Sequence, residues 1–207
     1  MDFHRFVLFF GHEFNDRLRF FSEFELEHSI AGEGQDGEIE LEQAYIEYDI
    51  NDQHRAKGGI FLIPVGIINE THEPPTFYGV DRNPIETNIT PATWWAGGAA
   101  LSGELGAGFS YDLAVHEGLQ TSATTYRPRS GRQKTSNALA SDLAYTARVR
   151  WTGMRGVEIG GSVQHQSDVT QGLDAAAGSA NLYELHTVLN KRAARPARPL
   201  RHEGSRG

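Results

Sequence analysis

A two-residue period in polarity runs through most of this chain and limits the folds open to it. In residues 18–27 one parity is apolar and the other charged, with Leu18, Phe20, Phe24 and Leu26 alternating with Arg19, Glu23, Glu25 and Glu27. Successive side chains of a β-strand point to opposite faces of a sheet, so this pattern separates the two sets. A helix would mix the three glutamates around its surface. The period therefore indicates β-structure.

Segments with this pattern recur along the chain, separated by turn residues, and they predict an all-β fold of about nine strands. We expect strands over residues 3–14, 18–27, 38–50, 56–65, 94–103, 109–118, 142–152, 157–166 and 181–189. In the third segment the apolar parity changes near Glu42 and Gln43, which predicts a β-bulge there.

The connections between these strands alternate in length. Residues 15–17, 51–55, 104–108 and 153–156 are short, whereas 31–37, 66–92, 119–141 and 167–180 are long. Outer-membrane barrels have short turns at one end and long loops at the other, and a soluble β-sandwich has no reason to keep such a rhythm. The rhythm favours an antiparallel up-and-down transmembrane β-barrel.

A helical membrane protein is excluded. A spanning helix needs about 20 mainly apolar residues. The best apolar run, Ile60 to Ile68, is shorter and contains Pro64.

The period alone leaves open which face of the sheet meets water. A membrane barrel turns apolar residues outward and polar residues toward its lumen, whereas a soluble or surface β-sandwich that binds a partner does the reverse. In the barrel interpretation, seven charged residues of the strands are candidates for lining the pore: Arg5, Arg19, Glu23, Glu25, Glu27, Arg148 and Arg150.

The connection over residues 66–92 is the strongest candidate for a functional loop. It lacks the two-residue period and contains embedded Ile, Phe and Tyr residues, which indicates a packed loop. It either folds into a lumen and narrows it, or packs outside for stability. Its polar members are the candidate constriction residues: Thr71, His72, Glu73, Arg82, Asn83 and Glu86.

Charge constrains the partners. Residues 1–190 hold 13 basic and 26 acidic side chains, a net charge of −13, which disfavours nucleic-acid binding. Glu38, Glu40 and Glu42 add to the acidic row at Glu23, Glu25 and Glu27. If both rows line a lumen they favour cations, although residues 38–42 fit a solvated extension equally well.

Nothing in the sequence predicts catalysis, a metal site or a cofactor. The chain has no cysteine. His12, His72 and His116 each precede a glutamate, but none continues to a second histidine at helical spacing, so we expect them to be structural or solvent-facing. No nucleophile elbow occurs. An outer-membrane barrel enzyme remains an alternative because some barrels are enzymes.

One part of the chain carries a more specific resemblance. Residues 58–66, 69–80, 86–91 and the pair Trp94-Trp95, with residues 4–12 and 23–27, resemble Gram-negative outer-membrane porins related to the phosphate-selective porin O and P family. The resemblance covers roughly residues 2–190. It implies a β-barrel in the bacterial outer membrane, contacts with its lipids, and passive diffusion of small solutes or ions, commonly through homotrimers. It implies no enzymatic activity.

The chain departs from this family in two respects. About nine strands are half of the 16 to 18 that leave an aqueous channel. Residues 191–207 are rich in Arg, Ala and Pro and lose the two-residue period, so we expect residues 1–190 to be a partial barrel and the rest a disordered or non-native tail. A truncated or frameshifted gene would explain both, and an unclosed sheet would not form a working pore alone. No signal peptide is visible.

Overall fold

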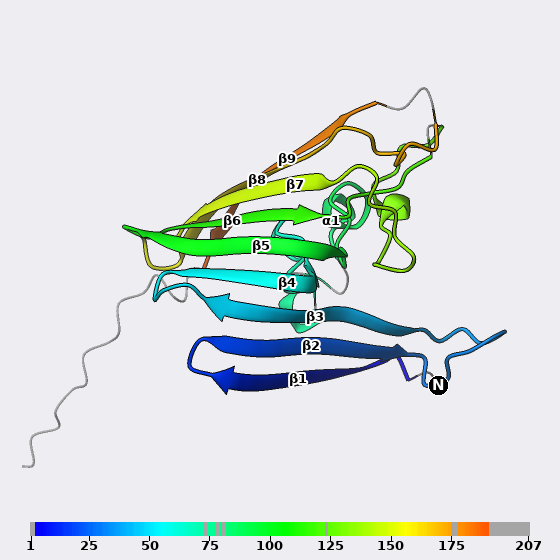
Figure 1. The fold of residues 1–207 in the computed structure, drawn as a ribbon, viewed down its shortest axis with the longest axis horizontal. Coiled ribbons are helices and arrows are strands. Elements are labelled where there is room, and N and C mark those ends of the chain that lie inside the picture. Colours follow the sequence, from blue (N-terminus) through cyan, green and yellow to red (C-terminus); the bar gives the residue numbers. More distant parts are fainter. Residues whose placement is uncertain are drawn as a thin grey trace, which may run out of the picture.

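The nine expected strands form one antiparallel sheet (Figure 1). The computed structural model describes residues 3–72, 74–77, 79, 82–122, 124–174 and 178–190. The basic tail therefore lies outside the described residues. The strands are β1 (Arg5–Asn15), β2 (Leu18–Glu27), β3 (Ile39–Asp49), β4 (His54–Leu62), β5 (Trp95–Gly106), β6 (Phe109–His116), β7 (Ala144–Trp151), β8 (Val157–Gln166) and β9 (Ala180–Leu189).

The sheet has up-and-down topology, because every strand pairs with its sequence neighbours. Within the described sheet, β1 and β9 are the two edges and do not pair with each other. The predicted bulge is confirmed in β3. Glu23 pairs with Gln43 and the next residue, Phe24, pairs with Leu41, so Glu42 is the extra residue.

The strand boundaries differ from the expected ones at β4 and β5. Strand β4 ends at Leu62, before Pro64, which has no N–H to donate to a sheet. Strand β5 continues to Gly106, so the connection to β6 is only Ala107 and Gly108. Both residues have positive φ, 51° and 84°, as a tight primed hairpin turn requires.

The long connections contain short helices that the sequence pattern did not predict. They are the 3₁₀ helices η1 (Pro74–Thr76) and η2 (Arg129–Gly131) and the α-helix α1 (Pro84–Asn88). The Asn83 side chain caps α1 by accepting a hydrogen bond from the Glu86 amide, and Pro84 suits the first turn. In the described part of the chain, no helix has the length and apolarity that a membrane crossing needs.

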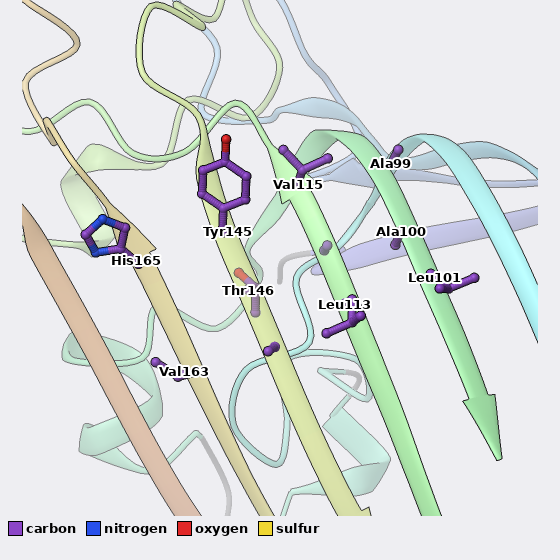
Figure 2. Close-up of a pocket in the computed structure, with 11 residues that line it drawn as sticks. Ala99, Ala100, Leu101, Leu113, Val115, Tyr145, Thr146, Val163 and His165 are labelled. Carbon is purple, nitrogen blue, oxygen red and sulfur yellow. The ribbon is translucent and has the colours of Figure 1, made fainter. Parts of the chain in front are cut away.

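One face of the sheet, here called the outer face, is apolar and exposed. Many of its large side chains are between 41% and 89% exposed, among them Phe6, Phe10, Ile39, Leu41, Ile46, Leu113, Tyr145, Val149, Ile159, Tyr183 and Leu185. A shallow apolar hollow of about 590 Å³ lies over β5 to β8 on this face (Figure 2). Such a surface suits lipid better than water.

The opposite face, here called the inner face, carries the charged side chains of the strands and is covered in part. Residues paired across the sheet point to the same side. Glu47 pairs with Lys57, and Asp112 pairs with Arg148, so these four charged side chains all lie on the inner face. The connection between β4 and β5, residues 63–94, is called the inner loop, and its described residues pack on this face. The buried core forms where the inner loop meets the sheet. It consists of Phe61, Ile63, Val65, Trp94, Ala96, Ala114 and Leu119.

The two-residue period in polarity leaves open a membrane β-barrel and a soluble β-sandwich, and the exposure of the two faces distinguishes between them. A sandwich buries its apolar face against a second sheet, but the described strands form a single sheet whose apolar side chains are exposed. The charged side chains of the strands lie on the opposite face, where several of them are buried. The structure is therefore consistent with a porin-type β-barrel wall and not with a soluble sandwich.

Candidate functional site

The inner loop is closed at its base by one buried amide side chain. Asn69 Nδ2 donates hydrogen bonds to the carbonyl oxygens of Ile63 and Trp94, each at 2.8 Å. Asn69 Oδ1 accepts from the Trp94 amide at 2.7 Å. These residues lie next to the ends of β4 and β5, so Asn69 holds the start and end of the loop together.

A second buried side chain organises the loop from within. Glu86 in α1 accepts hydrogen bonds from the amides of Ile67 and Ile68 at 2.9 and 2.8 Å. Together with the Asn83 cap, this places two of the predicted constriction residues inside the loop fold. Their contacts are structural.

The inner loop is anchored to the sheet at Arg148. The guanidinium group of this β7 residue is bound to Asp112 of β6, with Nε and Nη2 at 2.9 and 2.7 Å from Oδ2. It also pairs with Glu70 of the loop. Arg150 lies farther from the same carboxylate, at 3.9 Å. Both predicted arginines thus lie on the inner face, and one of them holds the loop.

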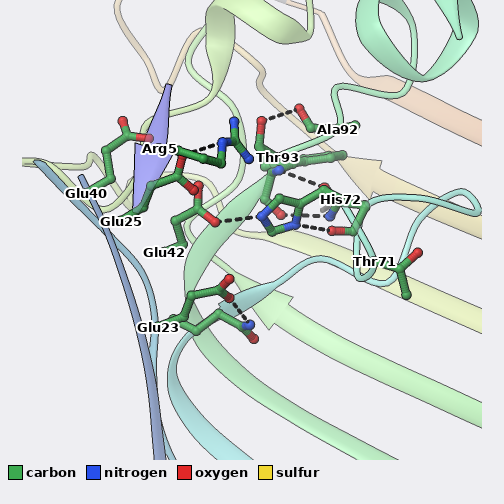
Figure 3. A network of polar contacts seen from close by, with 12 residues as sticks. Arg5, Glu23, Glu25, Glu40, Glu42, Thr71, His72, Ala92 and Thr93 are labelled. Carbon is green, nitrogen blue, oxygen red and sulfur yellow. Dashed lines mark hydrogen bonds and ion pairs between the residues drawn. The ribbon is translucent and has the colours of Figure 1, made fainter. Parts of the chain in front are cut away.

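A second anchor joins the loop to β3, next to Glu23 of β2 (Figure 3). His72 Nε2 lies 2.7 Å from Glu42 Oε2, and His72 Nδ1 lies 3.0 Å from the Asn69 carbonyl oxygen. Glu23 Oε2 accepts a hydrogen bond from Gln43 Nε2 at 2.6 Å. Burial lowers the pKa of the His72 imidazole, but the hydrogen bond and negative charge of Glu42 outweigh it, so the pKa lies above its ordinary value.

Glu25 and Glu27 continue the acidic row of β2 beyond Glu23. Glu25 is paired with Arg5, whose Nε lies 3.1 Å from Glu25 Oε1, and Arg5 also binds Glu27. Across the strand pair, Glu25 faces Glu40, which pairs with Lys134 of the β6–β7 connection. Arg5, Glu25 and Glu27 thus lie together on the inner face.

Arg19 lies away from this cluster, near the short turns. Its guanidinium group lies 2.8 Å from Glu47 and 2.5 Å from Asp49 on β3, and Arg55 of β4 lies 3.5 Å from Glu47. The inner face therefore carries a ladder of opposite charges at this end.

The remaining candidates of the loop do not converge on one point. Thr71 is exposed, and its hydroxyl donates to the Ile67 carbonyl at 3.4 Å. Arg82 donates to Thr93 Oγ1 at 3.3 Å. Glu73 lies outside the described residues. The role of these residues in a constriction stays a prediction.

Four residues important to this site were not among the candidates. The alternation of polarity in β6 and β4 places Asp112 and Lys57 on the inner face. The pattern that gave the other strand candidates could therefore have found them. Lys57 Nζ lies 5.2 and 4.9 Å from the ring centroids of Tyr45 and Phe61. Asn69 and Glu70 lie in an aperiodic loop, where the alternation of polarity gives no signal, although they belong to residues 69–80, which carry the resemblance to the porin family.

Comparisons with known proteins agree with this architecture. A family model described as phosphate-selective porin O and P matches residues 1–182. An uncharacterized protein of Aquifex aeolicus (strain VF5) is 35% identical over 167 residues, which cover 78% of this chain and 38% of that protein. The chain thus spans well under half the length of this relative.

Proposed function

Because this chain belongs to the phosphate-selective porin O and P family, we propose that it forms part of the wall of a water-filled outer-membrane pore. Small hydrophilic solutes and ions diffuse passively through this pore, and no covalent chemistry occurs. The observation that carries the proposal is the inverted polarity of the sheet, whose apolar outer face suits lipid and whose charged inner face suits water.

The charges of the inner face favour cations over anions. In the described strands this face carries six basic residues, Arg5, Arg19, Arg55, Lys57, Arg148 and Arg150, and twelve acidic ones. The acidic ones are Glu13, Glu23, Glu25, Glu27, Glu40, Glu42, Glu47, Asp49, Glu104, Asp112, Glu158 and Glu184. Phosphate selectivity needs a basic constriction, but Arg5, Arg19 and Arg148 are each bound to carboxylates.

The inner loop narrows the pore in this proposal. It is held against the inner face at two separated points, through His72 to Glu42 and through Glu70 to Arg148. A loop fixed at both points occupies space that would otherwise be lumen. Its position then sets the size of the solutes that pass.

Closing the wall requires strands in addition to the nine described, because lipid cannot satisfy the backbone groups of the edge strands β1 and β9. The 38% coverage of the Aquifex relative supports a larger complete barrel. Assembly into homotrimers is a further proposal, which the outer-membrane location would permit.

Two measurements test the pore. Expressed with a signal peptide and with the strands that complete its barrel, the protein should enter the outer membrane and migrate as a heat-modifiable species that needs detergent for extraction. Reconstituted in planar bilayers with its barrel complete, it should produce stepwise ionic conductance. A monomer that stays soluble in buffer alone, or a membrane species that never conducts, would contradict the proposal.

A further inference from the structure

Glu23, Glu42 and His72 each present one ligand atom to a common point, and these atoms all lie within 4.8 Å of one another. They come from β2, from the β3 bulge and from the inner loop (Figure 3). Each residue is only 2% exposed. We infer that this cluster binds one divalent transition-metal ion of the Zn²⁺ class, which joins the inner loop to the wall of the sheet.

The orientation of the His72 imidazole suits a metal ligand. The Nδ1 atom of His72 lies 3.0 Å from the Asn69 carbonyl oxygen, so an N–H at Nδ1 donates there and Nε2 is directed at the carboxylates. Metal-binding histidines are usually held in this way by a backbone carbonyl or a carboxylate. Asn69 is itself fixed by its three hydrogen bonds at the base of the loop.

The set of donor atoms selects the class of metal. One imidazole nitrogen and two carboxylates match the ligands of Zn²⁺, which leaves a fourth position for water or a solute. Mg²⁺ and Ca²⁺ prefer coordination by oxygen alone. The site should therefore discriminate against both.

The local charge supplies a second, independent argument. Burying two carboxylates beside each other is costly unless a cation compensates them. Glu25, next along the inner face of β2, adds a third carboxylate, and its buried Oε2 has no hydrogen-bond partner in the described part of the chain. Among the described residues, Arg5 pairs with Glu25 at 3.1 Å and His72 pairs with Glu42. A dication would balance the excess.

The spacing of the ligands explains why the sequence indicates no metal site. Glu23 and Glu42 lie on different strands, and His72 lies 30 residues beyond Glu42. Only the pairing of β2 with β3 and the folding of the loop bring them together. The bulge contributes directly, because Glu42 is its extra residue. The expectation of no metal site rested on helical spacing alone.

Zn²⁺ titration calorimetry on the detergent-folded protein with its barrel complete, in the presence of excess Mg²⁺, tests this site. One saturable Zn²⁺ per chain is expected. Glu23→Gln, Glu42→Gln and His72→Gln should each weaken binding at least about 10-fold, the loss typical for disturbing a metal site. His12→Gln, which changes an exposed histidine of β1, should bind as the parent does.

Glu23→Gln separates a metal site from a simple ion pair, because it leaves the His72–Glu42 contact in place. Each variant is first shown to retain the heat-modifiable folded form. Co²⁺ bound to the parent should give visible absorption bands that Glu23→Gln removes. Absent 1:1 binding, binding that Glu23→Gln leaves unchanged, or binding that His12→Gln abolishes would each overturn the inference. None of these outcomes depends on whether the protein conducts ions.

Discussion

Arg148 of β7 forms an ion pair with Glu70 of the inner loop, 78 residues earlier in the chain. Arg148 is 4% exposed and is also bound to Asp112, so removing Glu70 leaves it partly compensated. The contact therefore joins a loop to an arginine that the sheet already holds in place.

Glu70→Gln should loosen the inner loop without unfolding the sheet. The lost ion pair is partly exposed, so we expect a cost of about 1 kcal/mol. Limited trypsin digestion of the detergent-folded protein should then cut faster after Arg82. Glu104→Gln, at an exposed position of β5, is the matched control. Equal cleavage in both variants would show that Glu70 does not hold the loop.

Asn69→Ala should destabilise the protein more than any single exposed substitution in the loop. It leaves the buried Trp94 amide without its hydrogen bond, and the carbonyls of Ile63 and Trp94 each lose one of the two hydrogen bonds that they accept, at a cost of about 1–3 kcal/mol. Urea unfolding followed by tryptophan fluorescence measures the change. Asn88→Ala in α1 removes one exposed hydrogen bond and should cost under about 1 kcal/mol. Similar losses in both variants would refute the assigned role of Asn69.

A charged side chain introduced on the outer face should destabilise the protein folded in lipid, whereas one introduced on the inner face should be tolerated. Leu113→Arg on β6 places a cation on the apolar outer face, where lipid exposure costs about 2–4 kcal/mol near the bilayer midplane. The fraction folded into lipid vesicles, measured by heat modifiability, should fall. Ser102→Arg, on the inner face opposite Asp112, should fold normally. The reverse result would mean that the faces are wrongly assigned.

Acid should break the hydrogen bonds to Asp168 that hold the turn after β8. Asp168 accepts hydrogen bonds from the amides of Thr170 and Gly172 and from the Thr170 hydroxyl, and these bonds hold the pKa of its carboxyl below the ordinary 3.8. Because the folded pKa is depressed, the stabilisation is present above the ordinary pKa and is lost as pH falls through the folded value. The amide chemical shifts of Thr170 and Gly172 should titrate with a midpoint below 3.8. A midpoint at or above it would contradict this.

The alternation of polarity predicted most of the sheet. Strands β2 and β8 have the predicted bounds, and the bulge in β3 followed from a change of parity, because a period of two reports directly on side-chain direction. The boundaries of β4 and β5 differed because Pro64 and the Ala107-Gly108 turn act locally. The resemblance to a porin family was also confirmed.

The contacts of the inner loop could not be predicted in the same way. Glu86 and Asn83 were predicted as candidate constriction residues, but the side chains of the buried Glu86 and the exposed Asn83 accept hydrogen bonds from backbone amides of the loop. The meeting of His72 with Glu42 depends on where the loop folds over the sheet. A loop without a period carries no signal for such long-range contacts, so its polar residues were grouped by position alone.

The reversal potential of the completed pore across a KCl gradient in planar bilayers tests most directly whether this chain lines a cation-preferring pore. We expect stepwise conductance with preference for K⁺, because acidic residues outnumber basic ones on the inner face. Combined Glu25→Gln and Glu27→Gln substitution should reduce this preference. Clear anion selectivity, or a folded membrane protein without conductance, would contradict it.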